Sequence, residues 1–264
     1  MHAILATVGT DGDVFPYLGL GAALSARGHR VTLAAPEPYR ARALALGLEF
    51  RPLVTAADVG RMLSDPDLWH PLRSGPMMAR WGGPMIHRQY ETLAGLARDP
   101  GSVIVASPGV LAARLVQEKL GRPTASLLLQ PGLLPSSTAP PEMPGGLSIP
   151  PWLPRPLRGL YWLAVDAAGY LLVARSLNRV RAALGLGPVR RLFRWWLSPD
   201  RVIGLFPGWY AAPQPDWPPR LRLAGFGRFD GAGGALPDDV RAFCEAGPPP
   251  VAFTLGTGMT HAAG

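Results

Sequence analysis

Cysteine, lysine and charge are all scarce in this sequence. Cys244 is the single cysteine and Lys119 the single lysine, and charged residues make up only 17% of the 264 residues. One cysteine excludes an intrachain disulfide and favours a reducing compartment. A hydrophobic share of 48% is enough for a sizeable core and excludes a disordered chain. The length allows one large domain or two small ones.

A long uninterrupted apolar run is also missing. The longest apolar segment, residues 159–177, contains Asp166 and ends near Arg175. A bilayer span needs about 20 apolar residues with few or no charges, so this segment predicts a buried or interfacial helix. The apolar run at residues 3–8 is short and has no basic lead, unlike a secretory signal. We therefore expect a soluble, cytoplasmic protein.

The basic residues are not concentrated in one segment of the sequence. The formal net charge is +8, but nearly all of it is arginine spread along the chain. No compact basic run with interleaved aromatic residues is present, so we expect no nucleic-acid partner. Two aromatic and basic clusters, residues 150–162 and 190–197, fit peripheral contact with the inner face of a membrane. An ordinary protein face with arginines lying along apolar surface explains them better.

Strand and helix signals alternate through most of the chain. The pattern predicts an α/β fold: a Rossmann-like parallel sheet with helices on both faces. In residues 2–35, two short apolar strands flank a helix that ends at Gly28, as in a βαβ crossover. The expected strands are residues 2–8, 30–35, 49–53, 102–107, 123–131, 201–206 and 220–226. A proline-rich loop at 132–157 and a long helix at 157–184 complete the pattern.

The last residues predict the start of a second unit. We expect an N-terminal acceptor-binding Rossmann-like domain over residues 1–228, then a linker with a short helix over 229–249. Residues 250–264 read as the first strand and glycine loop of a second Rossmann-like domain. A strand and loop without a following helix do not complete a βαβ unit. We therefore expect the second domain to be truncated, so that a donor-binding domain is missing.

The loop between the first strand and the first helix, VGTDGD at residues 8–13, has three interpretations. Asp13 could cap a helix that begins near Val14 with Pro16 in its first turn. A dinucleotide site would need G-x-G-x-x-G directly after the strand, which is not there. In the third interpretation, Asp13 is a general base beside backbone N–H groups that hold a phosphate leaving group.

Several segments resemble bacterial GT-B fold glycosyltransferases with a G-[ST]-x-G-D loop. This branch of the UDP-glycosyltransferase superfamily includes sterol, glycopeptide and macrolide glycosyltransferases. The loop and its flanks, residues 4–36, carry the first likeness, and residues 251–258 resemble the first strand of the donor-binding domain. Residues 65–71 and 205–231 look most like the rhamnosyltransferases of rhamnolipid synthesis. The likeness extends over essentially the whole chain.

The resemblance implies roles for the loop residues. Asp13 falls at the position of the catalytic base that deprotonates the acceptor hydroxyl in an inverting, metal-independent reaction. The residues expected to approach the donor diphosphate are Gly9, Thr10, Gly12, Thr257 and Gly258. Asp11 departs from members that carry arginine there, and its charge would repel phosphate. Either Asp11 points to solvent, or the other domain meets most of the donor's charge.

The segment between the third and fourth expected strands reads as an acceptor site. Methionine and tryptophan make an adaptable apolar lining, although each could equally be an ordinary core residue. The expected acceptor-binding residues are Phe15, Trp69, Met77, Met78, Trp81, Met85 and Gln130. The histidines have no metal-ligand spacing, so we expect no metal and no cofactor besides the nucleotide-sugar co-substrate.

These features together predict a hexosyltransferase. It would transfer a hexose from a nucleotide-diphosphate sugar to a hydroxyl group of a hydrophobic acceptor. Our first choices are a lipid hydroxy acid as acceptor and deoxythymidine diphosphate rhamnose as donor. The alternative is a non-catalytic acceptor-binding module or gene fragment, inactive without a donor-domain partner. A hydrolase is disfavoured because no G-x-S-x-G elbow surrounds Ser107.

Overall fold

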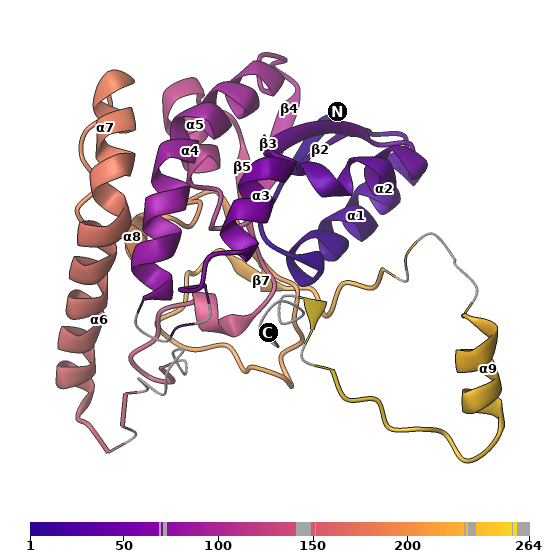
Figure 1. Cartoon of the computed structure of the whole chain (residues 1–264). Helices are drawn as coiled ribbons and strands as arrows, with labels where there is room; N and C mark the ends of the chain where they lie inside the picture. Colours follow the sequence, from indigo (N-terminus) through magenta and orange to yellow (C-terminus); the bar gives the residue numbers. More distant parts are fainter. Residues whose placement is uncertain are drawn as a thin grey trace.

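Seven parallel strands form one sheet in the order β3-β2-β1-β4-β5-β6-β7. The computed structural model (Figure 1) describes residues 1–68, 70, 73–140, 149–150, 152–229, 231, 236–254 and 256–257. The strands are β1 (His2–Ala6), β2 (Arg30–Pro36), β3 (Glu49–Val54), β4 (Ser102–Ala106), β5 (Thr124–Leu128), β6 (Arg201–Gly204) and β7 (Leu221–Leu223). The predicted α/β, Rossmann-like class is confirmed.

Helices follow the strands and cover both faces of the sheet. The α-helices are α1 (Asp11–Ala26), α2 (Arg40–Ala45), α3 (Ala56–Leu63), α4 (Ser74–Leu96), α5 (Leu111–Leu120), α6 (Arg155–Gly169), α7 (Arg175–Ala183), α8 (Leu192–Trp195) and α9 (Asp238–Glu245). Two 3-10 turns are η1 (Glu37–Tyr39) and η2 (Pro131–Leu133). A π-helical turn, Tyr170–Ala174, joins α6 and α7 into one long helix, as expected for residues 157–184.

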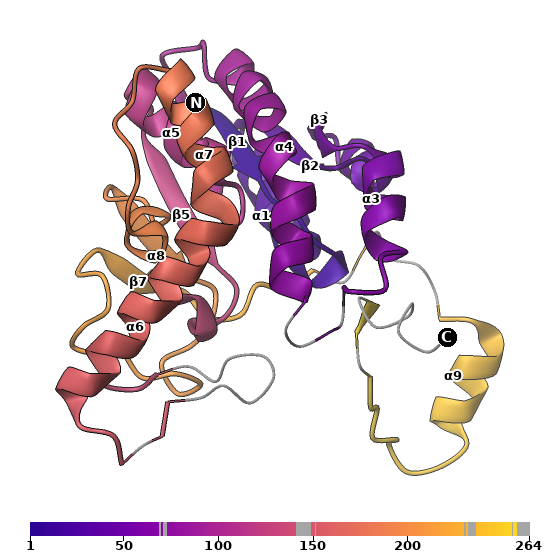
Figure 2. The ribbon, with the colours of Figure 1, turned by 60° about the vertical axis from the view of Figure 1, so that its left-hand side comes forward.

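The core has a layer on each side of the sheet. On one side, Leu5 and Leu33 of the strands pack with Leu18 of α1, near α2. On the other side, Ile4 and Ile104 pack with residues of α4 and α5. Helices α6 and α7 then lie outside α4 and α5 (Figure 2). Strands buried on both faces read as continuous apolar runs, which is why the sequence located them.

The strand order reverses direction beside β1. From β1 the chain moves to β2 and β3 on one side, and then returns to β4 on the other side. In open parallel sheets, ligands bind where this reversal leaves a crevice at the carboxyl ends of the strands. The loop from β1 into α1 lies at this place, so the fold brings the residues 7–13 to its preferred ligand-binding edge.

The long outer helix is largely exposed. Among the described residues, one helix, Pro156–Ala183, is long and apolar enough to cross a membrane by length and composition, and only 17% of its most apolar stretch is buried. Such a helix is weak evidence for a membrane span. Asp166 in its middle is buried and accepts the backbone N–H of Phe193 at 3.0 Å. The expectation of a buried helix is wrong, and that of an interfacial helix stays a prediction.

The expected strand of a second domain is not formed. Residues 251–254 have no secondary structure, and Val251 and Phe253 are 78% and 92% exposed. Helix α9 beside them is exposed along its whole length. A parallel strand needs neighbouring strands for its hydrogen bonds, and none lies beside this segment among the described residues. The domain boundaries at 228 and 249 stay predictions.

A substitution in the core tests this packing directly. We expect Leu33→Ala to lower the free energy of unfolding by about 2–5 kcal/mol, because it leaves a cavity beneath α1 and α2. Leu44 on α2 is 56% exposed, so Leu44→Ala should change that energy by less than about 0.5 kcal/mol. Chemical denaturation followed by circular dichroism measures both. Equal losses in the two variants would contradict the assigned core.

Candidate functional site

Asp13 lies in the first turn of α1 and closes the loop after β1. Its Oδ2 accepts the backbone N–H of Thr10 at 3.0 Å, and the Thr7 hydroxyl donates to its backbone carbonyl at 3.0 Å. Thr10 is the N-cap, and the helix begins at Asp11. The expectation that Asp13 caps a helix beginning near Val14 is therefore wrong. The helix starts earlier because an acidic third residue can satisfy the N-cap N–H from inside the first turn.

Gly9 is required where it stands. Its φ is +125°, and a Cβ on it would overlap the Asp13 carboxylate and lie 2.8 Å from the Asp13 Cβ. Only glycine adopts such a backbone conformation routinely. The carboxylate therefore lies directly against the loop backbone, at the carboxyl end of β1.

Asp13 has an altered affinity for protons. Burial of its carboxyl against the loop raises the pKa of Asp13, and the hydrogen bond from the Thr10 N–H offsets part of the increase. The residue nevertheless keeps an exposed face. A carboxylate with a raised pKa is a stronger base than an ordinary one, as general-base catalysis requires.

Asp11 is paired inside the domain. Its Oδ1 accepts the Tyr39 hydroxyl at 2.8 Å and lies 3.5 Å from Arg42 Nη1. Burial, and then the hydrogen bond to Asp11, raise the pKa of Tyr39 well above its usual value. Arg42 also lies over the Phe15 ring, 5.0 Å from its centroid. The Asp11 charge is thus countered within this chain, which neither sequence interpretation considered.

Tyr39 and Arg42 were missed in the sequence. Both follow β2, the neighbour of β1, so the carboxyl ends of two adjacent parallel strands bring them to the Asp11 loop. Their position after an expected strand was the available signal. Residue type alone gave none, because arginine is common throughout the chain.

A cavity of about 430 Å³ lies beside this loop. It brings Gly12 of the loop close to Thr257 near the end of the chain, with Phe15 and Phe229 in its wall, and these two rings meet edge to face at 5.6 Å. Gly9 and Thr10 do not line this cavity, and Gly258 lies outside the described residues. Two of the five predicted phosphate-loop residues therefore share one cavity.

The returning chain builds the outer wall of this cavity. A Cβ on Gly19 of α1 would lie 2.9 Å from the Arg228 carbonyl oxygen. Glycine at that position lets residues 227–229 cross close to α1, where Gly227 and Phe229 line the cavity. The segment after β7 thus belongs to the site.

The predicted acceptor residues do not form one surface. Met77 and Met85 are only 1% and 6% exposed. They are core residues, so the prediction that they line an acceptor pocket is wrong. Core and pocket linings are both apolar, and spacing on α4 cannot separate them. Met78 is exposed, and Trp81 donates its indole N–H to Asp65 Oδ2 at 3.0 Å.

Three further acceptor candidates have separate places. Phe15 lines the cavity beside Gly12. Gln130 is exposed just after β5, and Trp69 lies outside the described residues. Among the described residues, no group of three or more histidine, cysteine, aspartate or glutamate side chains could hold a metal ion. The chemistry available at the described part of the site is that of a carboxylate and backbone amides.

Comparison with known proteins identifies related chains. Residues 3–131 match the Glycosyltransferase family 28 N-terminal domain. The chain is 30% identical over 270 residues to the O-mycaminosyltylonolide 6-deoxyallosyltransferase of Streptomyces fradiae, and 27% identical over 273 residues to the vancomycin aglycone glucosyltransferase of Amycolatopsis orientalis. Each alignment covers 97% of this chain and 61% of the relative. The chain thus spans about three fifths of the length of these curated relatives.

Solved structures share the fold. The Streptomyces sp. SF2575 glycosyltransferase SsfS6 aligns over 90% of this chain and 57% of its own, with a TM-score of 0.55 and 20% identity. The kitacinnamycin glycosyltransferase aligns over 88% and 54%, with a TM-score of 0.57 and 20% identity. The predicted resemblance to GT-B glycosyltransferases is confirmed, and the finer likeness to rhamnosyltransferases stays a prediction.

The Gly9 contact can be tested against a matched glycine in the same loop. We expect Gly9→Ala to lower the free energy of unfolding by about 1–3 kcal/mol, since it strains the backbone and displaces Asp13. At Gly12 a Cβ would meet no atom within 4 Å. Gly12→Ala, inside the helix, should raise stability by up to about 1 kcal/mol. Thermal denaturation measures both, and a neutral Gly9→Ala would contradict the contact.

The raised pKa of Asp13 predicts a pH-dependent stability. Ionising Asp13 costs more in the folded than in the unfolded protein, so its favourable contribution is lost as pH rises through the folded pKa. The side-chain amide of the Asp13→Asn variant has no such transition and keeps an oxygen for the Thr10 N–H. The variant should therefore gain stability relative to the wild type between pH 4 and pH 7. Denaturation at both pH values checks this, and a relative loss would refute the raised pKa.

Proposed function

We propose that this chain, whose residues 3–131 match the glycosyltransferase family 28 N-terminal domain, is the acceptor-binding part of a nucleotide-sugar-dependent glycosyltransferase. The enzyme transfers a hexose to a hydroxyl group of a hydrophobic acceptor. One observation carries the proposal: the Asp13 carboxylate lies at the ligand-binding edge of the sheet with a raised pKa.

Asp13 would act as the general base. It takes the proton of the acceptor hydroxyl while that oxygen attacks the anomeric carbon of the sugar. The bond to the nucleoside diphosphate breaks on the opposite face, so the anomeric configuration inverts and the diphosphate leaves with the bonding electrons. General-base assistance contributes about 10²–10⁴-fold in rate. No step in this sequence requires a metal.

The cavity beside Gly12 fits the donor diphosphate. Backbone N–H groups at the start of α1 attract an anion, and the pairing of Asp11 with Tyr39 and Arg42 lowers the repulsion there. A structure of SsfS6 is complexed with thymidine diphosphate, which favours a deoxythymidine diphosphate sugar as donor. Deoxythymidine diphosphate rhamnose is the first donor to test.

The acceptor class rests on the relatives and on Phe15. The curated relatives are named for a tylonolide and for the vancomycin aglycone, and Phe15 offers an apolar wall in the cavity beside Gly12. A lipid hydroxy acid is our proposed acceptor. Catalysis would also need a donor-binding domain, corresponding to the part of the relatives that this chain does not match.

A transferase explains the comparisons better than a non-catalytic module. The alignments with named glycosyltransferases cover 97% of this chain, including the loop that carries Asp13. We place the reaction in the cytoplasm, since Cys244 is exposed and unpaired.

The test measures binding and transfer separately. Acceptor binding is followed by calorimetry during titration with 3-hydroxydecanoate, and Phe15→Ala, which removes the apolar wall of the cavity beside Gly12, should weaken it. Transfer from deoxythymidine diphosphate rhamnose is followed by mass spectrometry on a protein that joins this chain to a donor-binding domain, with and without Asp13→Asn. We expect Asp13→Asn to bind the acceptor within twofold of the wild type and to lose transfer by at least about 100-fold.

Two results would contradict the proposal. Transfer that is unchanged in Asp13→Asn would remove Asp13 from the role of base. Failure to bind thymidine diphosphate, 3-hydroxydecanoate and the vancomycin aglycone alike would contradict the glycosyltransferase assignment itself. Met85→Ala serves as the control for a buried residue of α4, since any effect it has should be on stability.

A further inference from the structure

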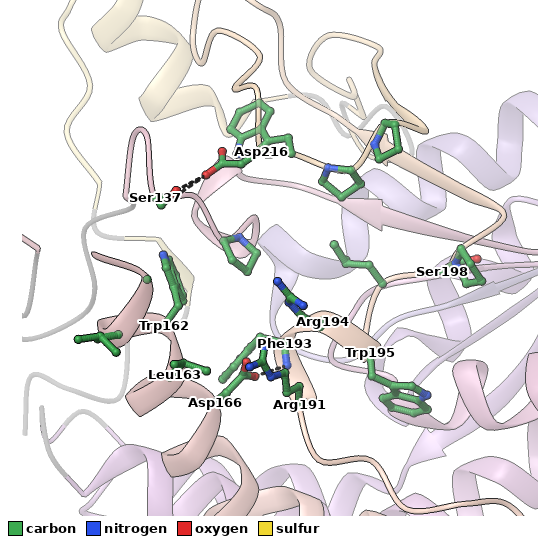
Figure 3. Close-up of a pocket in the computed structure, with 18 of the residues that line it drawn as sticks. Ser137, Trp162, Leu163, Asp166, Arg191, Phe193, Arg194, Trp195, Ser198 and Asp216 are labelled. Carbon is green, nitrogen blue, oxygen red and sulfur yellow. Dashed lines mark hydrogen bonds between the residues drawn. The ribbon is translucent and has the colours of Figure 1, made fainter. Parts of the chain in front are cut away.

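A second and larger cavity, of about 910 Å³, lies under the outer helix (Figure 3). Its walls come from α6, from α8 and from the loops that precede β6 and β7. Four aromatic side chains line it: Trp162 from α6, Phe193 and Trp195 from α8, and Trp217 from the loop before β7. The volume falls within the range of about 300–1,000 Å³ that is typical of small-molecule sites.

This cavity is separate from the site around Asp13. The two cavities share no lining residue. Figures 1 and 2 show α6 and α8 on the side of β5 to β7, whereas the start of α1 lies across the sheet from them. The larger cavity is therefore not the reaction centre, and the mechanism above makes no use of it.

The acidic groups of the larger cavity are already occupied. Asp166 accepts the backbone N–H of Phe193, and Asp216 accepts the Ser136 hydroxyl at 2.7 Å. The Arg114 guanidinium donates to the Trp195 carbonyl oxygen at 3.0 Å. These hydrogen bonds hold α6, α8 and the loops together and orient both carboxylates toward groups of the protein.

Two arginines that line the cavity have no acidic partner in the described part of the chain. Arg191 and Arg194 are exposed and line the cavity, and within the described part of the chain no acidic side chain forms an ion pair with either of them. Figure 3 shows both side chains among the cavity residues. In the same wall, the buried indole N–H of Trp217 has no hydrogen-bond partner among the described residues. Unpaired donors of this kind favour an anion.

The mouth of the cavity is apolar. Leu160 and Leu163 of α6 line it and are 58% and 42% exposed. Leu157 and Leu171 extend the same exposed apolar stripe along the outer helix. Contiguous exposed apolar patches often mark ligand-binding grooves, and this one continues into a cavity.

We propose that this cavity binds an amphiphile with one long apolar chain and an anionic head group. The head group meets Arg191 and Arg194, and the chain packs between the aromatic rings and leaves along Leu160 and Leu163. Arginine recognises carboxylate and phosphate alike through paired N–H donors. The site goes beyond the proposed transfer reaction and stands independently of it.

Dodecanoate below its micelle concentration is the first probe. Trp162, Trp195 and Trp217 in the walls report binding by fluorescence, and calorimetry gives the stoichiometry, expected to be one. Replacing both arginines by alanine, Arg191→Ala with Arg194→Ala, should weaken binding at least tenfold. Arg27→Ala removes an exposed arginine at the far end of α1 and should change it less than twofold.

A blocking variant tests the cavity without removing charge. Gly159 lines the cavity within α6, and a Cβ on it would meet no atom within 4 Å. Gly159→Phe should fill the space and weaken dodecanoate binding at least tenfold with an unchanged circular dichroism spectrum. Dodecanol, which lacks the charge, should bind at least tenfold more weakly than dodecanoate.

Vesicles separate the two sources of such a ligand. Binding of both dodecanoate and phosphatidylglycerol vesicles, lost in Gly159→Phe, would identify a membrane lipid as the source, and binding of dodecanoate alone a free fatty acid. Adsorption to phosphatidylglycerol vesicles without dodecanoate binding would overturn the cavity site in favour of simple surface contact. Dodecanoate binding that survives both the arginine and the Gly159→Phe substitutions would overturn it as well.

Discussion

The contact between the Gly9 backbone and the Asp13 carboxylate organises the candidate reaction site. It needs a glycine with φ of +125°, because any side chain there would overlap the carboxylate. The same carboxylate accepts the Thr10 N–H and so starts α1. The Asp13 side chain thus ends the loop and begins the helix, and its partly desolvated carboxylate lies at the edge of β1. The same side chain therefore has a structural role in the loop and a chemical role in the proposed reaction.

The parallel sheet explains how the surrounding charges are arranged. Adjacent parallel strands end at the same edge, so the residues after β2 reach the loop after β1. Tyr39 and Arg42 use this proximity to counter Asp11, which would otherwise face a phosphate ligand with its own negative charge. Arg42 also lies over Phe15, and Phe15 contacts Phe229 on the returning chain. Charge and packing are therefore linked across three segments.

The sequence predicted the strands and helices that have a clear local pattern of apolar residues. The central strands were located because strands covered on both faces are continuous apolar runs, as in β1, β4 and β5. The helix start was wrong, since Thr10 and Asp13 are both acceptable caps and only the geometry decides between them. Met77 and Met85 were misplaced because core and pocket linings use the same residues. Residues 251–254 have no secondary structure, and the start of a second domain there stays a prediction.

Asp166 shows how a single buried acid can shape a distant surface. Placed in an otherwise apolar helix, it turns one side of α6 toward α8, where it accepts the Phe193 N–H. Leu160 and Leu163 line the same cavity as Asp166 and remain 58% and 42% exposed. The same hydrogen bond sets the position of α8 and with it that of Arg194. The sequence had shown Asp166 only as an interruption in a hydrophobic run, whereas in the structure it lines the larger cavity and links α6 to α8.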